Sequence, residues 1–537
     1  MNRTPIQRLC ALRHSIGFLL VITLLLYTVP LRVMADDGDL DGTLFGGTVI
    51  TDFFGQDDVA SAVAVQTDGK IVTAGFTFQP GSNFDFALAR YNVDGTLDPD
   101  FGGGRIVTDF FGQFDMAADI AIQNDGKIVV VGQCFESFVT DSDFAVARYN
   151  SDGNPDLTFG TGGKVTSDFF GEDDRATAVA ILPNGKIVVA GSARNGVFLD
   201  FAIARYNADG SPDIHFGSDG KTVTDFTGTE DTIEDIALQS DDKIVVVGST
   251  FNRATKSNFA IARYKVNGHL DPSFAFGGKV TADFFGESDN ATSVDIHRDG
   301  KIVVAGNAEV IVTPFPKTTS IDFAVARYNP DGRIDKSFSS DGKLTTDFNR
   351  QQDRALAVAV QSDGKIVAAG LVNPPAGFFS DFGLVRYNAN GNIDTSFGSG
   401  GKAITDFFGS ADSVEDIAIQ RDGRIIAVGS AHDSSGLPNF ALARYDGSTP
   451  IPQGSLEYLV LDVTFLVGTG VLTDQEGNSL ILKLDSAIRK LDKGLSGSLS
   501  VQAFANQVQN LISSGRLTAD QAELLINEAN GVLNRIN

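Results

Sequence analysis

Short loops rich in Asn, Asp and Gly recur along the chain and offer closely spaced oxygen donors. In the first two loops these donors are Asn92, Asp94, Asp98, Asn150, Asp152 and Asp156. Calcium is coordinated by six to eight oxygen atoms, so closely spaced oxygen donors of this kind suit a calcium site. The twelve-residue EF-hand loop with its terminal Glu is absent, however, and Asn and Asp also close turns by bonding their own backbone. We therefore interpret the loops as turns and keep a calcium site as the alternative; no other cofactor is expected.

Two charged positions recur in every unit of a sevenfold pattern. One aspartate follows a Phe-Phe-Gly-type turn, at Asp58, Asp115, Asp174, Asp231, Asp289, Asp353 and Asp412. One arginine precedes a tyrosine, at Arg90, Arg148, Arg205, Arg263, Arg327, Arg386 and Arg444. A catalytic group is needed once rather than seven times, so we expect both series to be structural. A buried arginine must find a carboxylate or backbone carbonyls.

A third polar position opens the last strand of each unit. It is occupied by Asp85, Asp143, Asp200, Asp322 and Asp381, with Asn258 and Asn439 in the other two units. The same reasoning from recurrence predicts a structural role for it.

Catalytic motifs are scarce. Beyond the first 35 residues the histidines are His215, His269, His297 and His432, at scattered positions. There is no His-Glu-x-x-His, no Gly-x-Ser-x-Gly and no paired-cysteine metal spacing. We predict no catalytic residue, although a hydrolase that uses only carboxylates stays open, because 68 acidic residues offer no way to select two.

The positions above belong to one unit repeated seven times. Asp-Gly-Lys-Ile-Val recurs, with variations, at spacings of 57, 59, 57, 58, 64 and 59 residues. Its basic residues are Lys70, Lys127, Lys186, Lys243, Lys301, Lys365 and Arg424. A fixed period of this length is typical of repeat architectures.

Each unit reads as four β-strands. In the first unit they are expected at about 48–54, 60–66, 70–76 and 84–92, and the turn Asp68-Gly69 joins the second to the third. Alanines alternate along the last strand, which would let a neighbouring sheet approach closely. Radial stacking buries both faces of such sheets, so we predict a mainly β fold, a seven-bladed β-propeller over residues 44–447. An open array of sheets is the alternative.

The motifs resemble a known repeat. The run Asp-Phe-Ala-Leu-Ala-Arg-Tyr-Asn, followed by Asp-Gly-x-Leu-Asp-x-x-Phe-Gly, Asp-Phe-Phe-Gly and Asp-Gly-Lys-Ile-Val, is similar to the bacterial delta-60 repeat. The resemblance covers about 400 of the 537 residues. It implies β-propellers in exported proteins, without a settled activity or catalytic residues.

The loops between the third and fourth expected strands vary most. They are Phe76–Asn83, Gln133–Ser142, Ser192–Leu199, Ser249–Ser257, Asn307–Ile321, Leu371–Ser380 and Ser430–Pro438. We expect them to line one rim of the ring, where variable loops on a repeated framework usually carry specificity. Tolerated insertion without function is the alternative.

The N-terminus has the pattern of an export signal. Arg3, Arg8 and Arg13 precede an apolar run, and a small-residue cleavage site ends at Ala35. We predict a signal peptide over 1–35, a short acidic leader over 36–43 and a secreted or cell-surface protein, with an uncleaved anchor as the alternative. Cys134 would then be the one cysteine left.

The formal net charge is −26, and the residues after the predicted signal carry −30. We therefore expect a soluble, monomeric protein that does not bind nucleic acid and has no membrane span after cleavage of the signal peptide.

The C-terminal part changes its pattern. A linker is expected over 448–455, and the apolar period then becomes helical over 456–537, which predicts a module of four helices. Thr473 and Glu476 suit a capping box. The module resembles the FIMAH domain of exported bacterial proteins through Gly470-Val471-Leu472, Lys483-Leu484 and the run from Phe504 to Leu517. That resemblance implies an accessory binding role.

Together these features predict an exported, non-enzymatic binding or scaffold protein whose propeller rim contacts an extracellular protein or glycan. An extracellular carboxylate-based hydrolase of the glycan type and a calcium-stabilised adhesin are the alternatives.

Overall fold

The computed structural model describes residues 37–80, 83–136, 141–226, 228–252, 256–315, 317–348, 351–374, 379–420, 422–447, 472–491, 498–514 and 516–517, with a few single positions of the C-terminal module. The predicted signal peptide and the linker 448–455 lie outside these residues.

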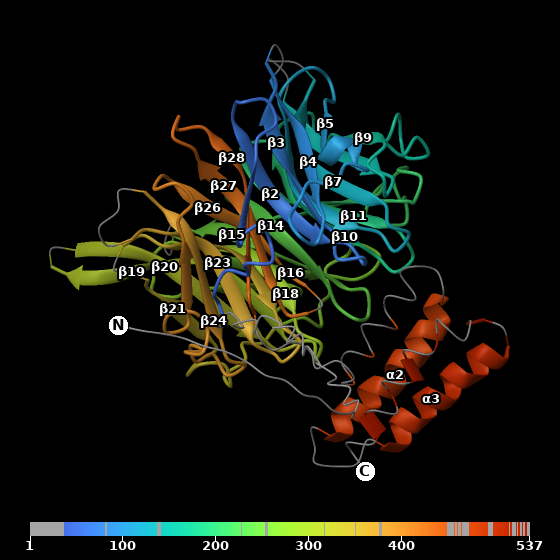
Figure 1. Cartoon of the computed structure of the whole chain (residues 1–537). Coiled ribbons are helices and arrows are strands. Elements are labelled where there is room, and N and C mark those ends of the chain that lie inside the picture. The colour runs from blue at the N-terminus through green and yellow to red at the C-terminus, as the bar shows by residue number, and fades with distance from the viewer. Residues whose placement is uncertain are drawn as a thin grey trace, which may run out of the picture. The chain divides into compact units, whose positions relative to one another are not determined.

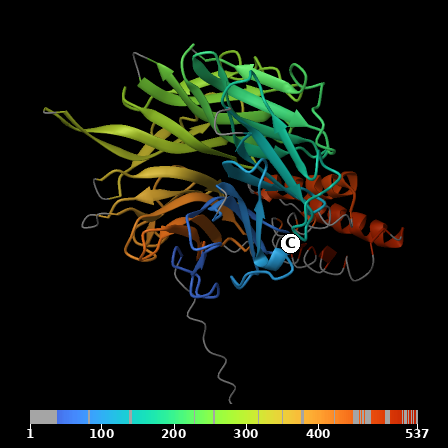
Figure 2. The same ribbon diagram turned by 90° about the horizontal axis from the view of Figure 1, so that it is seen from above.

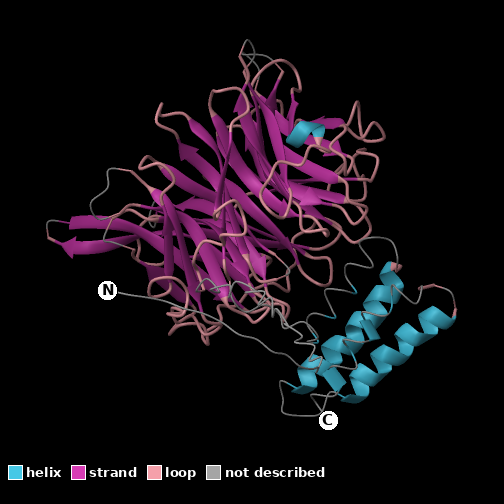
Figure 3. Ribbon diagram, viewed as in Figure 1, coloured by secondary structure: helices cyan, strands magenta, loops and turns pink. Residues whose placement is uncertain are grey.

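Seven four-stranded antiparallel sheets form the predicted β-propeller (Figures 1 and 3). Blade 1 contains β2 (Asp58–Val65), β3 (Ile71–Phe78), β4 (Phe84–Tyr91) and β5 (Arg105–Thr108), with the short helix η1 (Gly102–Gly104) before β5. Blade 2 contains β6 (Asp115–Ile122), β7 (Ile128–Phe135), β8 (Ser142–Tyr149) and β9 (Lys164–Ser167). Blade 3 contains β10 (Asp174–Ile181), β11 (Ile187–Asn195), β12 (Phe198–Tyr206) and β13 (Lys221–Thr224).

The remaining blades repeat this order. Blade 4 contains β14 (Asp231–Leu238), β15 (Ile244–Asn252), β16 (Lys256–Tyr264) and β17 (Lys279–Ala282). Blade 5 contains β18 (Asp289–Ile296), β19 (Ile302–Pro314), β20 (Lys317–Tyr328) and β21 (Lys343–Thr346). Blade 6 contains β22 (Arg354–Val360), β23 (Ile366–Val372), β24 (Asp381–Tyr387) and β25 (Lys402–Thr405). Blade 7 contains β26 (Asp412–Ile419), β27 (Ile425–His432), β28 (Pro438–Tyr445) and, as its outer strand, β1 (Thr48–Thr51).

The ring is closed by strands from both ends of the propeller. Strand β1 pairs with β28, and β2 contacts β26 and β27, so the first and last blades are neighbours (Figure 2). The sequence unit is therefore offset from the blade by one strand: the first strand of each unit completes the preceding blade.

The segment predicted as a short acidic leader lies against the last blade. The amide of Gly38 donates to the carbonyl of Asp446, and the amide of Asp41 donates to the carbonyl of Arg444 at 2.8 Å. Leu44 is fully buried in the apolar cluster between blades 7 and 1. The segment that begins at residue 37 is thus part of the propeller.

Seven apolar clusters fill the seven blade junctions. The alternation of β4 shows how one strand serves two of them. Phe86 and Leu88 pack toward blade 2, whereas Ala87 and Ala89 pack toward blade 7. Small alanines on one face allow the neighbouring sheet to approach, as expected.

Each inner strand carries a β-bulge, such as the register shift between Ala60 and Ala62. Opposite it lies a glycine of the second strand. A Cβ atom on Gly75 would lie 1.9 Å from the carbonyl oxygen of Val59, so a side chain has no room there. The repeated glycine of the Ile-Val-x-x-Gly run is explained by this contact.

The C-terminal module contains α2 (Asp474–Leu491) and α3 (Ser498–Ser513) among its described residues. The predicted capping box is confirmed: the amide of Glu476 donates to Thr473 Oγ1, and the amide of Thr473 donates to Glu476 Oε2 at 2.8 Å. Leu459, Leu484, Val508 and Leu525 share one buried cluster. Much of the first and fourth predicted helices lies outside the described residues. Over the positions that are described, no helix has both the length and the apolar character of a membrane span.

Candidate functional site

The antiparallel connections place alternate loops at opposite ends of the ring. One end, here called the turn end, carries the Asp-Gly turns and the Asn-x-Asp-Gly loops. The other, here called the variable-loop rim, carries the variable loops and the Asp-Phe-Phe-Gly turns that lead into the next blade. The predicted site residues divide between these two ends.

The repeated arginines form ion pairs at the turn end. Arg90 Nε lies 2.7 Å from Asp98 Oδ2, and Lys70 Nζ lies 2.8 Å from the same oxygen. The guanidinium carbon is 4.4 Å from the centre of the Phe101 ring. Arg90 also donates to the carbonyl of Ser151 in the next blade. Arginine, aspartate and the Asp-Gly-Lys lysine therefore form one network that crosses the blade junction.

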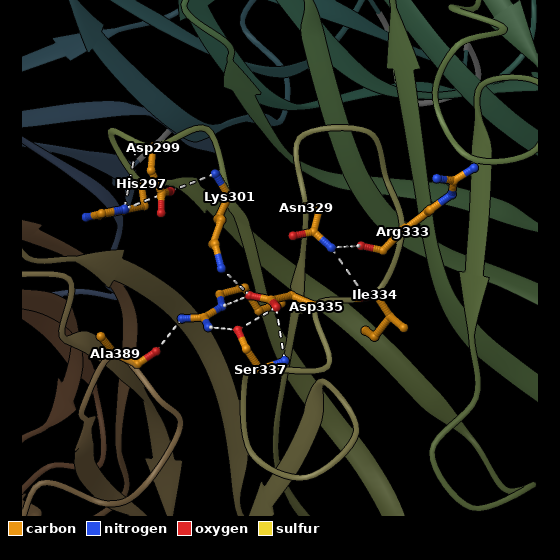
Figure 4. Close-up of polar contacts among 10 residues, drawn as sticks. His297, Asp299, Lys301, Asn329, Arg333, Ile334, Asp335, Ser337 and Ala389 are labelled. Carbon is orange, nitrogen blue, oxygen red and sulfur yellow. Dashed lines mark hydrogen bonds and ion pairs between the residues drawn. The ribbon is translucent and has the colours of Figure 1, made fainter. Parts of the chain in front are cut away.

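Blade 5 shows the same network in Figure 4. Lys301 Nζ lies 2.6 Å from Asp335 Oδ2, and Ser337 Oγ donates to Asp335 Oδ1 at 2.6 Å. Arg327 pairs with Asp335 at 2.8 Å and donates to the carbonyl of Ala389 in blade 6. Arg148, Arg205, Arg263 and Arg386 occupy equivalent positions. In the last blade Arg444 pairs with Asp41 at 2.7 Å.

The calcium candidates lie in these turn-end loops and have partners within the protein. Asp94 accepts from the amide and the hydroxyl of Thr96, at 3.0 and 2.7 Å. Asp152 accepts from the amide of Asn154 at 3.0 Å. These contacts are the Asx turns that the sequence predicted.

The remaining calcium candidates also form hydrogen bonds or ion pairs within the protein. The backbone amides of Asn92 and Asn150 each close their loop at 2.8 Å, onto Thr96 and Asn154. Asp98 and Asp156 are bound by the arginine and lysine of their own blade, and hydrogen bonds and these cations lower the pKa of both carboxyl groups against the opposing effect of burial. Calcium at these loops stays a prediction.

The tyrosine of the Arg-Tyr pair faces the preceding blade, whereas the arginine contacts the next one. The hydroxyl of Tyr91 donates to Thr51 of blade 7 at 2.8 Å, and that of Tyr149 donates to Thr108 of blade 1 at 2.7 Å. Burial raises the pKa of Tyr91 to about 12. In five of the seven units the tyrosine hydroxyl thus bonds to the preceding blade. The sequence pattern did not reveal this role because the partners of the tyrosines lie 39 to 41 residues away.

The repeated aspartates lie at the variable-loop rim, where they hold the Phe-Phe-Gly turns. Oδ2 of Asp115 accepts from the amide of Phe110 at 2.6 Å, and the other six make the same contact at 2.5–2.9 Å. Within the described part of the chain, Oδ1 of Asp115, Asp174 and Asp289 is buried and has no hydrogen-bond partner. Burial raises the pKa of each of these three groups to about 7.

Three acids that the sequence did not single out lie beside the bulges of the inner strands. Asp119, Asp235 and Asp416 accept from the amides of Val179, Val294 and Val63, each at 2.7–2.8 Å and each in the next blade. Loss of hydration, followed by repulsion from Asp235 and Asp416, raises the pKa of Asp119 well above its usual value. Their second oxygens accept from the following amide of their own strand, so all six oxygens serve the ring itself.

A polar pocket of about 230 Å³ opens at the rim between blades 2, 3 and 4. Its lining residues are Gln133, Phe135, Ser142, Asp173, Arg175, Thr177, Ser192, Arg194, Leu199, Thr232, Ile233 and Glu234. Arg175 Nε donates to Gln133 Oε1 at 3.2 Å, and Arg194 Nε lies 3.6 Å from Asp173 Oδ2. Arg175 and Glu234 are exposed, so both charges can meet a ligand.

The pocket breaks the sevenfold repeat. The strand position of Arg194 is occupied by Phe78, Phe135 and Phe251 in three other blades. The bulge position of Glu234 is occupied by Ser61 and Ala118 in two others. Sequence reasoning missed these residues because each charge occurs in only one or two of the seven units, as with Glu234 and Glu415, and therefore leaves no sevenfold pattern.

The fifth variable loop is a hairpin rather than an irregular loop. Strands β19 and β20 continue through it, and their pairing extends to Pro314 and Lys317 (Figure 1). The side chains of Val312 and Phe315 near its tip are 57% and 94% exposed. Lys317, which begins β20 near the tip, forms an ion pair with Glu287 of the turn before β18.

A larger groove of about 890 Å³ lies on the outside of the ring between β17 and β21. Lys279, Arg333, Lys336 and Lys343 line it together with Phe276, whose side chain is 93% exposed. It adds a locally basic surface to an otherwise acidic protein.

The seven repeats match a known sequence family. The DUF5122 β-propeller family model matches the chain seven times. Residues 66–101, 123–159, 182–216, 239–274, 297–338, 361–397 and 420–448 are matched, one segment for each repeat. The family is described as a β-propeller domain of unknown function, so the match agrees with the propeller without assigning an activity.

Solved structures with similar folds have low sequence identity. A protein of unknown function from Bacteroides caccae is 14% identical, with a TM-score of 0.34, and 62% of this chain aligns with 98% of it. The polysaccharide lyase Uly1 is 11% identical, with a TM-score of 0.41 and coverage of 72% and 90%. The α-L-arabinanase of Penicillium chrysogenum is 9% identical, with a TM-score of 0.40 and coverage of 75% and 99%. No curated protein matches the chain in sequence. The delta-60 and FIMAH resemblances stay predictions.

Proposed function

We propose that this chain is an exported, non-enzymatic binding protein that holds an extracellular ligand at its variable-loop rim. The observation that carries the proposal is the rim pocket, where the sevenfold repeat is broken by exposed charged side chains. Export is inferred from the predicted signal peptide over 1–35.

The pocket favours a small polar group of a larger ligand. Its volume of about 230 Å³ lies below the range of about 300–1,000 Å³ that drug-sized ligands occupy. Arg175 and Arg194 offer planar donors for carboxylate or hydroxyl oxygens, and Asp173 and Glu234 offer acceptors. An acidic or hydroxyl-rich sugar unit of a glycan fits this donor set, and a polar side chain of a protein would use the same contacts.

A glycan array probed with the labelled exported chain tests the proposal. We expect binding to some arrayed glycans that falls at least tenfold in Arg175→Ala and in Arg194→Ala. Lys265→Ala is the matched control, because Lys265 is an exposed cation of the turn end. Equal losses in the control, or unchanged binding in both pocket variants, would contradict a rim site.

The hydrolase alternative is tested on the same array hits. Both oxygens of the inner-strand acids Asp119, Asp235 and Asp416 already accept hydrogen bonds from backbone amides, so these carboxylates are committed to the structure of the ring. We therefore expect no product release from any bound glycan. Turnover that disappears on substitution of one rim carboxylate would replace the binding proposal with an enzymatic one.

A further inference from the structure

Three aspartates meet at the rim where blade 1 joins blade 2. Asp85 begins β4, Asp109 follows β5 and Asp115 begins β6, so the group spans two blades. One carboxylate oxygen from each lies within 4.8 Å of the others. The same arrangement occurs at three more junctions, formed by Asp143, Asp168 and Asp174, by Asp200, Asp225 and Asp231, and by Asp381, Asp406 and Asp412. We call these four groups the carboxylate triads.

Two members of each triad have a structural task. Oδ1 of Asp109 accepts from the amide of Gly112, which closes the Phe-Phe-Gly turn. Oδ2 of Asp115 accepts from the amide of Phe110. These contacts explain why aspartate recurs at both positions, and they leave one oxygen of each carboxylate directed elsewhere.

Asp85 has no such task. Its side chain is fully buried, and among the described residues neither of its oxygens has a hydrogen-bond partner. Oδ1 of Asp115, also fully buried, is without a partner too. An unpaired buried carboxylate is costly, so a residue of this kind needs a counter-charge that the protein itself does not supply.

The lysine beside this triad makes its hydrogen bond to the main chain and not to a carboxylate of the triad. Lys164 Nζ donates to the main-chain carbonyl of Asp109 at 2.8 Å and lies 5.3 Å from the centre of the Phe110 ring. Burial, first, and then the neighbouring carboxylate of Asp109 raise the pKa of Asp85 to about 6. The triad is thus a confined group of three acids without a side-chain cation among them.

We propose that each of the four carboxylate triads binds a calcium ion at the junction of two blades. Calcium lies 2.3–2.6 Å from its ligands, so oxygens on opposite sides of one ion are up to about 5 Å apart, which accommodates the spacing of the triads. Three carboxylates form an all-oxygen donor set, which suits a hard cation rather than zinc or copper. Water and nearby carbonyl oxygens would complete the shell.

The other three junctions lack a complete triad. Asn439 replaces the aspartate next to Asp52 and Asp58, and Asn258 replaces it next to Asp283 and Asp289. At the junction of blades 5 and 6 the equivalent positions are Asp322, Asp347 and Asp353, but among the described residues they are not one of the compact groups. Asp322 accepts from Ser320 Oγ at 2.6 Å, and Asp353 Oδ1 accepts from the amide of Asn373 at 3.2 Å. The chain therefore contains natural variants with the same fold and fewer free carboxylate oxygens.

Calcium titration of the chelator-treated exported chain by isothermal calorimetry tests the proposal. We expect about four ions per chain, one for each triad. Asp85→Asn should reduce the number by one and leave the far-ultraviolet circular dichroism unchanged, because asparagine already occupies the equivalent position in two other units. Asn439→Asp should add an ion by completing a triad with Asp52 and Asp58.

Two controls decide between sites and between ions. Asp94→Asn, which alters a turn-end loop, should leave the number of ions unchanged. A number that falls in Asp94→Asn but not in Asp85→Asn would overturn the triads in favour of the loops. Absence of binding at millimolar calcium, or binding of Mg²⁺ alone, would overturn the assignment to calcium.

Discussion

At the scale of single residues, the repeated charges of this chain act across blade junctions. Arg148 bonds to Asp156 within its own blade, and the adjacent Tyr149 bonds to Thr108 of the blade before it. Neighbouring residues of a strand point to opposite faces, which is why one dipeptide can serve two junctions. The arginine and tyrosine therefore recur seven times because the ring has seven blade junctions.

Substitution of one such arginine should be costly. In Arg148→Met the carboxylate of Asp156, only 4% exposed, keeps Lys127 at 3.2 Å but loses its buried partner. We expect the free energy of unfolding to fall by about 3 kcal/mol, as when one partner of a buried pair is removed. Guanidinium denaturation would measure the loss.

The matched control removes both charges. Arg148→Met combined with Asp156→Leu should recover most of the lost stability, because no unpaired charge stays buried. A single variant as stable as the parent protein would show that Lys127 alone satisfies Asp156.

The inner-strand acids Asp235 and Asp416 should make stability depend on pH in the opposite sense to a salt bridge. Burial raises the pKa of Asp235 to about 6 and that of Asp416 to about 7, with further repulsion from Asp295 on the former and from Asp235 and Glu415 on the latter. Their contribution is complete below the unfolded pKa of about 3.9 and is lost as the pH rises through the folded values. We therefore expect the free energy of unfolding to fall between pH 5 and pH 8.

The double variant Asp235→Asn with Asp416→Asn isolates this effect. Its stability should vary less between pH 5 and pH 8 than that of the parent chain, when both are measured by denaturation at saturating calcium. An equal change of the free energy of unfolding with pH in both proteins would show that other groups titrate in this range.

At the scale of elements, the sequence predicted most strands because their signals are local. Alternating residues and Asp-Gly turns define the hairpins, and the strands of blade 1 lie within a few residues of the expected ranges. The offset between unit and blade could not be predicted, since it depends on a pairing between β1 and β28 almost 400 residues apart. The hairpin β19–β20 was predicted as a loop because Pro314 and Pro316 interrupt its pattern.

The candidate site was less predictable for the same reason. The carboxylate triads combine residues that were singled out as two separate repeats with the aspartate of the Asp-Phe-Phe-Gly anchor, and their members come from two blades. Arg175 and Arg194 lie on paired strands of blade 3, but the pocket around them forms only when Gln133 of blade 2 and Glu234 of blade 4 are in place. Spacing within a unit carries information on its own strands but little on contacts between units.

The glycine opposite each bulge gives a prediction at this scale. In Gly248→Ala the new Cβ would lie 1.8 Å from the carbonyl oxygen of Thr232, so β14 and β15 must separate. We expect a loss of about 1–3 kcal/mol, typical of an overpacked site. Thermal unfolding would measure it, with Gly42→Ala as the control because its Cβ would meet no atom within 4 Å. Equal melting temperatures would contradict the steric explanation.

At the scale of the whole molecule, the N-terminal segment completes the ring. Repeats one to six obtain the aspartate of their turn-end network eight residues after the arginine, but blade 7 obtains it from Asp41, at the other end of the propeller. Asp41 binds Arg444 at 2.7 Å and Arg424 at 3.0 Å, and Asp37 binds Arg386 of blade 6. The last blade is therefore assembled from both ends of the propeller.

Removal of the ion pair between Asp41 and Arg444 should open the junction of the first and last blades before the whole protein unfolds. In Asp41→Asn the guanidinium of Arg444, 1% exposed, loses its carboxylate but keeps Val93 and Thr43 as acceptors. We expect a loss of about 3 kcal/mol, and faster amide exchange confined to β1, β28 and β2, because local opening samples the seam with the fewest remaining bonds. Hydrogen exchange with mass spectrometry would locate the change, and Asp94→Asn, an exposed turn aspartate, is the control. Exchange that accelerates evenly in all seven blades would mean that the ring unfolds as one unit and that its closing seam is no weaker than the rest.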